Sequence, residues 1–158
     1  AAAAGSADKV AACRALGADL GIDYRKQDFV AEILAATGKR GVDVVLDMVG
    51  GDYAQRNIDC TAVDGRIVQI ATLGGHLAQI DLRRIMMKRL TYTGSTLRPR
   101  TVAQKAAIAR ALEDRVWPML AQGRCKPQIF ATFPLREAAK AHALMESSAH
   151  VGKIVLIA

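Results

Sequence analysis

The stretch that decides the fold is VDVVLDMVGG, residues 42–51. Its first eight residues are mostly apolar and rich in the β-branched residue valine, which is typical of a strand buried on both faces of a parallel sheet. The two glycines that follow, Gly50 and Gly51, end the strand. This stretch therefore predicts an α/β fold in which helices cover both faces of one sheet.

Short β-branched runs alternate with amphipathic runs on both sides of this stretch. Further strands are predicted at residues 1–4, 20–23, 66–71, 90–95, 128–133 and 153–157. Helices are predicted behind an N-cap at Ser6 and at residues 28–37, 53–63, 82–88, 101–121 and 135–147. Pro118 is expected to kink the last turn of the helix at 101–121. The alternation, with right-handed crossovers, predicts a doubly wound parallel sheet.

The composition is that of a folded protein of ordinary domain size. The chain has 158 residues, of which 51% are hydrophobic, and its mean hydropathy of +0.13 argues against intrinsic disorder. A charge interrupts every apolar run short of the roughly 20 residues of a membrane span. The three cysteines form no disulfide framework, and residues 1–4 lack the basic flank of a signal peptide. These observations favour a cytoplasmic protein.

The net charge of +7 is open to more than one interpretation. Lysine and arginine are spread along the chain and are densest between residues 83 and 100, where a solvated helix face would explain them. The alternatives are a nucleic acid, an anionic membrane or a phosphate-bearing ligand of the NADP type. Aromatic residues make up only 4% of the chain, which argues against the stacking surfaces of most single-strand nucleic-acid binders. We expect no nucleic acid and no membrane as partner.

The first strand-to-helix turn contains a candidate anion site. In doubly wound sheets, ligands bind outside the carboxyl ends of the strands. Gly5 would allow close approach, and the start of the next helix would offer N–H groups, the Ser6 hydroxyl and the Lys9 charge. An adenosine 2′-phosphate needs such a cradle, whereas an NAD site usually has an acid at the end of this strand. The alternative is an ordinary capped helix.

Two further turns each place two glycines after a strand. They read DMVGG at residues 47–51 and ATLGG at residues 71–75. A flat ligand lying across the strand ends needs small residues there, and tight turns without a ligand are the alternative. The three histidines, His76, His142 and His150, have no partners at metal-ligand spacing, so no metal site is predicted.

Six segments occur in order along essentially the whole chain: AGSADKVAACRALGAD, GIDYRKQDF, GVDVVLDMVGG, DGRIVQIATLGG, LTYTGSTLRPR and FPLREAAKAHALMESSAHVGKIVL. Together they resemble the quinone oxidoreductases, the zinc-free, zeta-crystallin-like branch of the medium-chain dehydrogenase/reductase superfamily. The resemblance implies a two-domain, NADPH-dependent reductase, usually a homodimer. Such an enzyme transfers hydride from NADPH to a small-molecule quinone or to another activated carbonyl or alkene.

The resemblance also implies roles for individual residues, although it leaves the catalytic residues unknown. Ser6 and Lys9 would hold the 2′-phosphate of NADPH, Gly5 would allow its close approach, and Tyr24 would lie beside it. The adenine and ribose region would be lined by Val49 and Gly50. The residues implied near the nicotinamide ribose are Ile70, Ala71, Leu73 and Gly74. The residues implied to reach the cofactor or substrate pocket are Leu97 and Arg98.

The chain also departs from the resembled family. It contains no G-x-G-x-x-G turn, no first Rossmann strand and no catalytic domain. We therefore expect a partial Rossmann domain at residues 1–127, and at residues 128–158 the return segment of the missing catalytic domain. The fragment is expected to be inactive alone. An enoyl reductase of the same superfamily and a non-catalytic Rossmann-like binding module are the alternatives.

The missing strand leads to a structural prediction. In the strand order 3-2-1-4-5-6 it would lie between the strands at residues 1–4 and 42–47. We expect these two strands to stay apart by about 9–10 Å, twice the usual spacing. Direct pairing, or insertion of another segment of the chain, are the alternatives. The strand at 153–157 is expected to lie away from this sheet, and the exposed edge at 90–95 to pair with a second copy.

Overall fold

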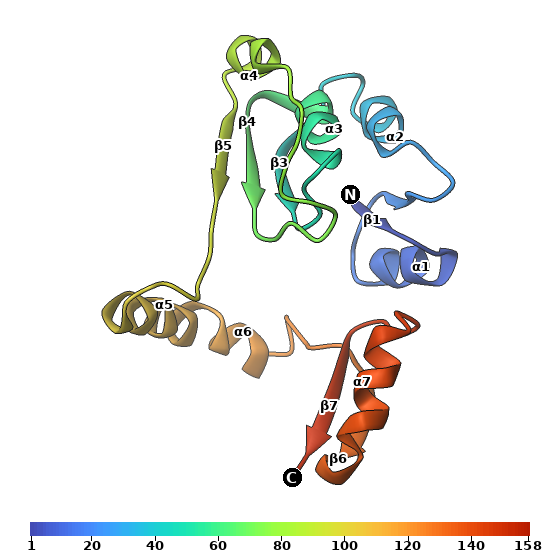
Figure 1. Cartoon of the computed structure of the whole chain (residues 1–158), viewed down its shortest axis with the longest axis vertical. Helices are drawn as coiled ribbons and strands as arrows, with labels where there is room; N and C mark the ends of the chain where they lie inside the picture. Colours follow the sequence, from blue (N-terminus) through green and yellow to red (C-terminus); the bar gives the residue numbers. More distant parts are fainter. The chain divides into compact units, whose positions relative to one another are not determined.

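The computed structural model describes residues 1–158 and divides them into two compact units, Ala1–Pro99 and Arg100–Ala158 (Figure 1). The predicted strands and helices are present, with changes in their bounds. No helix in either unit is long and apolar enough to cross a membrane. The predicted division at residue 127 refers to the domains of a longer enzyme and stays a prediction.

The first unit alternates strands and helices as the sequence predicts. In chain order its elements are β1 (Ala2–Ala4), α1 (Ala7–Ala15), β2 (Gly21–Asp23), α2 (Phe29–Ala36), β3 (Val42–Asp47), α3 (Tyr53–Cys60), β4 (Thr61–Gln69), α4 (Leu82–Lys88) and β5 (Thr91–Gly94). They form two parallel sheets, one of β1 and β2 and one in the order β3, β4, β5. A helix joins each strand to the next, as parallel pairing requires.

The first unit has no continuous sheet, because β1 and β3 are not paired with each other. No other strand of the chain lies beside the open edge of either. A cavity is lined by residues of both strands and their flanks, including Ala1–Ala3, Val42 and residues 44–49. The prediction that the two strands stay unpaired is therefore confirmed, and both alternatives, direct pairing and insertion of another segment of the chain, are wrong. The predicted spacing of about 9–10 Å stays a prediction.

Side chains of α2 and α3 hold the two sheets together. Phe29 and Cys60 belong to a buried cluster with Ile22 of β2. The ring of Phe29 stacks on that of Tyr53 with their centroids 5.4 Å apart. The guanidinium of Arg56 lies 4.1 Å from the centroid of the Phe29 ring, a cation–π contact. This buried cluster thus lies between the two helices and β2.

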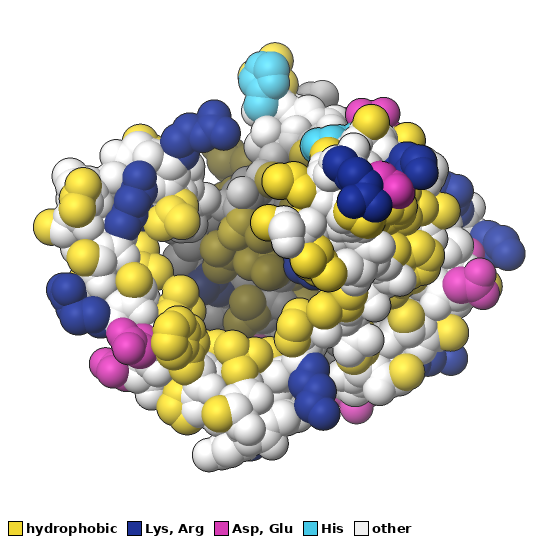
Figure 2. Space-filling model, turned by 90° about the horizontal axis from the view of Figure 1, so that it is seen from below, with side chains coloured by type: hydrophobic (Ala, Val, Ile, Leu, Met, Phe, Trp, Pro, Cys, Tyr) yellow, Lys and Arg dark blue, Asp and Glu magenta, His cyan; other side chains and the backbone are white.

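The prediction that β3 is buried on both faces is wrong for this chain. Val44 is 62% exposed and Leu46 is 61% exposed, whereas Asp47 at the end of the strand is buried. The apolar pattern of β3 is that of a central strand, but one of its edges has no partner and borders the cavity. Figure 2 shows that hydrophobic side chains are also spread widely over the face in view.

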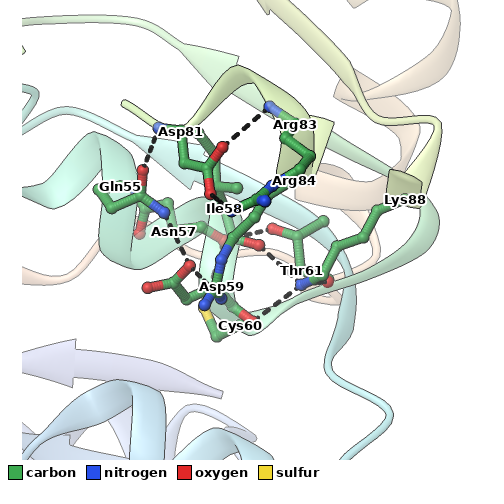
Figure 3. Close-up of polar contacts among 10 residues, drawn as sticks. All are labelled: Gln55, Asn57, Ile58, Asp59, Cys60, Thr61, Asp81, Arg83, Arg84 and Lys88. Atoms are coloured by element: carbon green, nitrogen blue, oxygen red, sulfur yellow. Dashed lines mark hydrogen bonds and ion pairs between the residues drawn. The ribbon is translucent and has the colours of Figure 1, made fainter. Parts of the chain in front are cut away.

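The junction between α3 and β4 is tighter than the sequence predicts. The helix expected to reach residue 63 ends at Cys60, and β4 follows at once. Lys88 of α4 stabilises this boundary (Figure 3). Its Nζ donates hydrogen bonds of 2.8–2.9 Å to three backbone carbonyls, those of Ile58, Asp59 and Thr61. Carbonyls at the end of a helix have no donor within the helix, and here the Lys88 ammonium supplies that donor.

Replacing Lys88 by methionine should lower the free energy of unfolding by about 1.5–3 kcal/mol, the usual contribution of hydrogen bonds to a charged group. Methionine keeps much of the apolar stem but leaves three carbonyls without a donor. The measurement is urea denaturation of the chain followed by circular dichroism. Lys26→Met is the matched control, because Lys26 is exposed and its ammonium makes no comparable contacts. Equal shifts for the two variants would contradict a role for Lys88 in this junction.

The second unit contains a helical segment followed by a parallel two-stranded sheet. Its elements are α5 (Val102–Arg115), α6 (Trp117–Ala121), β6 (Ile129–Pro134), the 3₁₀ turn η1 (Leu135–Glu137), α7 (Ala138–Glu146) and β7 (Lys153–Ile157). β7 pairs with β6 alone, as expected for a terminal strand that lies away from the main sheet. α7 packs against both strands.

The helix predicted at residues 101–121 is divided into α5 and α6 at Val116. Pro118 lies in the first turn of α6. Proline has no N–H to donate to the carbonyl four residues earlier, so an unbroken helix would leave the Asp114 carbonyl without a partner. The predicted effect of Pro118 is therefore confirmed, although the break comes before the last turn.

Candidate functional site

The cavity in the first unit brings four of the predicted cofactor residues together. It has a volume of about 850 Å³ and is lined by residues of β1, β2, β3, α2, α3 and the turn after β4. Tyr24 follows β2, Val49 follows β3, and Leu73 and Gly74 follow β4. These residues come after the carboxyl ends of parallel strands, where ligands of doubly wound sheets bind.

The turn after β1 packs against the residue that follows β2. A Cβ atom on Gly5 would lie 2.6 Å from the hydroxyl oxygen of Tyr24 and 3.3 Å from Nε of Arg25. A larger residue at position 5 would therefore displace the Tyr24 hydroxyl from its present place. Ser6 caps α1, because its Oγ accepts the Lys9 N–H at 3.4 Å. The ordinary capping role is thus present, and it leaves the N-terminus of α1 beside Gly5.

Arg25 is a cation at this turn to which sequence reasoning gave no role, although it directly follows a predicted strand. Its backbone N–H donates to Oδ1 of Asp23 at 3.1 Å. The side chain lies close to Gly5, within a few residues of the positive end of α1. The available signal was its place in IDYRK, directly after the implied phosphate neighbour Tyr24.

The two double-glycine turns pack against each other. The N–H of Gly74 donates to the carbonyl of Val49 at 2.7 Å, and the N–H of Leu73 donates to the carbonyl of Met48 at 3.1 Å. A Cβ atom on Gly50 would lie 2.6 Å from the carbonyl oxygen of Gly75, and Gly50 has a φ of +69°. The glycines are thus needed for contact between the turns. The interpretation of the glycine pairs as tight turns is therefore confirmed. Their contact with a flat ligand stays a prediction.

Replacing Gly50 by alanine should destabilise the chain by about 1–3 kcal/mol more than replacing Gly38, because only the first methyl group collides with backbone. Both glycines have a positive φ, +69° and +58°, so the strain of the left-handed conformation is common to both variants. A Cβ atom on Gly38 meets nothing within 4 Å. Urea denaturation of the two variants measures the difference, and equal losses would show that the turns do not constrain each other.

Asp47 organises the turn after β3. Its side chain is buried, with 4% of the residue exposed. The carboxylate accepts hydrogen bonds from the N–H groups of Val49 at 2.6 Å and Gly50 at 3.2 Å, and from Nδ2 of Asn57 at 3.0 Å. Sequence reasoning missed this role. The sequence feature that could have revealed it is an acidic residue at the end of an apolar run, three positions before Gly50.

Gln69, the last residue of β4, and Tyr92 of β5 are joined by a side-chain hydrogen bond. Nε2 of Gln69 donates to the carbonyl of Ala71 at 2.5 Å, and the Tyr92 hydroxyl donates to Oε1 of Gln69 at 2.8 Å. Burial, and secondly the charge of Asp47, raise the pKa of Tyr92 above its ordinary value, so the hydroxyl keeps its proton at neutral pH. Through Gln69, these hydrogen bonds join the carboxyl end of β4 to Tyr92 of β5.

The remaining predicted residues do not line the cavity. Ile70 and Ala71 follow β4, and Leu97 and Arg98 follow β5. Ile70 and Leu97 are exposed. Their implied roles near the nicotinamide ribose and the substrate stay predictions. His, Cys, Asp and Glu side chains form no group of three or more that could hold a metal ion.

Residues 16–156 match the family model described as "Zinc-binding dehydrogenase". The chain is 30% identical to 2-haloacrylate reductase of Burkholderia sp. over 95% of its own length and 45% of that protein. It is 28% identical to quinone oxidoreductase 1 of Escherichia coli (strain K12), over 97% of its length and 47% of that protein.

Among solved structures, the chain resembles Escherichia coli quinone oxidoreductase complexed with NADPH. The TM-score is 0.80 at 28% identity, over 99% of this chain and 48% of that one. The chain thus spans about half the length of the relatives it matches. It belongs to the zinc-binding dehydrogenase family, in the quinone oxidoreductase branch of the medium-chain dehydrogenases/reductases, and corresponds to the cofactor-binding part of these enzymes.

Proposed function

We propose that this chain is the NADPH-binding part of an oxidoreductase that transfers hydride from NADPH to a quinone. The observation that carries the proposal is the convergence of Tyr24, Val49, Leu73 and Gly74 on one cavity after the strand ends. Such a location is the usual ligand site of a doubly wound sheet. Relatives named as quinone oxidoreductases, one of them complexed with NADPH, support the choice of cofactor and substrate.

The turn after β1 would hold the adenosine 2′-phosphate. Ser6 and Lys9 at the start of α1 would supply a hydroxyl and a positive charge, and Arg25 would add a second cation beside Gly5. Guanidinium and ammonium groups bind phosphate through charge-assisted hydrogen bonds. β1 ends in alanine, so no carboxylate occupies the position that would favour the ribose hydroxyls of NADH.

The other strand ends would contact the rest of the cofactor. Val49 and Gly50 would line the adenine and ribose region, and Leu73 and Gly74 the nicotinamide ribose. A Cβ atom on Gly74 would lie 2.9 Å from Cγ1 of Val49, so a larger residue would close the space between the two turns. Bound NADPH would supply the hydride. The chain's own residues would bind and orient it, and the substrate would be met by residues such as Leu97 and Arg98.

Reduction of an activated alkene is the second candidate activity, because 2-haloacrylate reductase is also among the relatives. We propose that either reaction runs without zinc, because the six segments of the sequence resemble the zinc-free branch of the superfamily. We also propose a cytoplasmic enzyme that is a homodimer through the edge of β5. This strand is paired on one side only, with β4, and all four of its residues are exposed.

The test uses the product of the entire open reading frame that encodes this chain. NADPH oxidation is followed at 340 nm with 1,4-benzoquinone and, separately, with 2-chloroacrylate. We expect turnover with the quinone and preference for NADPH over NADH. Turnover with 2-chloroacrylate but not with the quinone would overturn the quinone proposal and favour an activated alkene as the substrate. No NADPH binding, measured by its fluorescence, would overturn the cofactor assignment, and sedimentation showing a monomer would overturn the dimer.

A further inference from the structure

Gln69 occupies the carboxyl end of the central strand of the second sheet (Figure 1). In the register of the sheet it lies opposite Asp47, the last residue of β3, and Gly94, the last residue of β5. Its backbone completes the pairing with β5, because its carbonyl accepts the Ser95 N–H at 3.0 Å. The Gln69 side chain thus stands where all three strands of this sheet end.

Both ends of the Gln69 amide are hydrogen-bonded. Nε2 donates to the carbonyl of Ala71 at 2.5 Å and to that of Asp47 at 3.4 Å, while Oε1 accepts the Tyr92 hydroxyl at 2.8 Å. A carbonyl can only accept, so the two carbonyls fix the orientation of the amide, and the Tyr92 hydroxyl must be the donor to Oε1. Burial raises the pKa of Tyr92, so this donor keeps its proton at neutral pH.

Ala71 connects this amide to the turn that lines the cavity. Its carbonyl takes a hydrogen bond from a side chain, two residues after the pairing of β4 with β5 ends at Gln69. Leu73 and Gly74 follow directly and line the cavity proposed to hold the cofactor. Their N–H groups donate to the turn after β3. The turn at residues 71–75 is therefore held by the first turn on one side and by Gln69 on the other.

The place of this turn matters for the proposed reaction. Hydride transfer needs the reacting atoms in a near-attack arrangement about 3–3.5 Å apart, and a misplacement of about 1 Å can lower the rate about a hundredfold. The turn at residues 71–75 is the part of the chain proposed to lie against the nicotinamide ribose. A side chain that sets the position of this turn would therefore influence the rate of the chemical step.

We propose that Gln69 and Tyr92 are positioning residues, which act through the Ala71 carbonyl to place the nicotinamide of NADPH for hydride transfer. We call the three residues the Tyr92–Gln69–Ala71 relay. Tyr92 directs the Gln69 amide, and the amide directs the Ala71 carbonyl and the turn that follows it. The inference rests on the proposed function, and it concerns two side chains that do not line the cavity themselves.

Two variants interrupt the relay at successive points, in the product of the entire open reading frame. Gln69→Met keeps the length of the side chain without its donor, and Tyr92→Phe removes one oxygen atom. The assay uses NADPH and the acceptor that the wild-type protein reduces, 1,4-benzoquinone or 2-chloroacrylate. We expect kcat to fall about tenfold to a hundredfold in each variant. The KM for NADPH should stay within about twofold, because the contacts proposed for the adenosine end are unchanged.

An isotope effect identifies the step that is slowed. With NADPH deuterated at C4, the isotope effect on kcat should be larger in Gln69→Met and Tyr92→Phe than in the wild-type protein, because hydride transfer then limits the rate. Thr93→Val is the matched control, since it removes a hydroxyl from the opposite face of the same strand, and it should leave kcat and the isotope effect unchanged. A kcat that is unchanged in both relay variants would overturn the positioning role.

The double variant, with Gln69→Met and Tyr92→Phe together, tests the order of the relay. It should lose no more activity than Gln69→Met alone, because Tyr92 is proposed to act only through Gln69. Losses that multiply would show that the two side chains act independently and would overturn the relay. If Gln69→Met does not fold, as judged by circular dichroism, Tyr92→Phe decides the matter through kcat and the isotope effect, since it changes one atom of an exposed residue.

Hydrogen exchange without cofactor gives a readout that does not depend on turnover. The amides of Leu73 and Gly74 should exchange about threefold faster or more in the two relay variants than in Thr93→Val, because the turn is then held from one side only. Equal exchange in all three variants would overturn the link from Gln69 to the turn. Faster exchange with an unchanged kcat would show a structural role alone, and the positioning role would fall.

The wild-type protein separates this inference from the proposed function. If it neither binds nor oxidises NADPH, the proposed function is overturned and the positioning role falls with it. If it oxidises NADPH and the relay variants do so at the same rate, the proposed function stands and the positioning role alone is overturned.

Discussion

Replacing Lys9 by alanine should raise the KM for NADPH about 10- to 150-fold and leave the KM for NADH nearly unchanged. The range corresponds to a charge-assisted hydrogen bond to phosphate, about 1.5–3 kcal/mol. Lys9 lies in the first turn of α1, and its backbone N–H is already used by the Ser6 cap. The ammonium group is the part of the residue proposed to distinguish the two cofactors, because only NADPH carries the 2′-phosphate.

The measurement uses the product of the entire open reading frame, with KM determined for both cofactors at one ionic strength, because salt screens exposed charges. Lys39→Ala is the matched control. Lys39 is an exposed lysine that lies before the amino end of β3, at the edge opposite the strand ends that form the site. An NADPH/NADH ratio that Lys9→Ala leaves unchanged would refute the phosphate contact, as would an equal loss in both variants.

Replacing Asp47 by alanine should lower the free energy of unfolding by at least about 3 kcal/mol. The carboxylate accepts hydrogen bonds from Val49, Gly50 and Asn57, and each buried donor left without a partner costs about 1–3 kcal/mol. A domain's whole stability is only about 5–15 kcal/mol. The loss should be accompanied by faster hydrogen exchange at the amides of Val49 and Gly50.

Asp43→Ala is the control for this substitution, because it makes the same change on the same strand. The Asp43 side chain is 68% exposed, and its partner is Arg40, which holds the pKa of that carboxyl below its usual range. An exposed pair of this kind contributes little to stability, so the loss should be far smaller than the loss at position 47. Similar losses at positions 43 and 47 would show that the buried hydrogen bonds of Asp47 do not hold the turn.

The order and type of the elements could be predicted because local patterns determine them. The run at residues 42–47 is β3 as predicted, and the capping residue Ser6 starts α1. The gap beside β1 could also be predicted, because the resembled family has its first strand at this place in the strand order and the sequence does not contain that strand. The exposure of Val44 and Leu46 could not be seen in the pattern of β3, because an apolar run shows what a strand would bury and not what covers it.

The site could be predicted in part, for a related reason. Tyr24, Val49, Leu73 and Gly74 meet because strand ends converge in this fold, which the alternation of elements implies. The roles of Asp47, Gln69 and Tyr92 depend on side chains of separate strands and a helix meeting in space. Likewise, the reason for the paired glycines is the approach of one turn to the other, which composition does not reveal.

The hydrogen bonds between the turns at residues 48–51 and 72–75 have a kinetic consequence. Both turns are held by backbone contacts to each other, and the Asp47 carboxylate holds the first of them, before any ligand arrives. A ligand that settles on them would meet a surface that needs little rearrangement, so few torsional degrees of freedom remain to be frozen on binding. Association would then be governed by diffusion and by the charges near Gly5, and the lifetime of the complex by the contacts made afterwards.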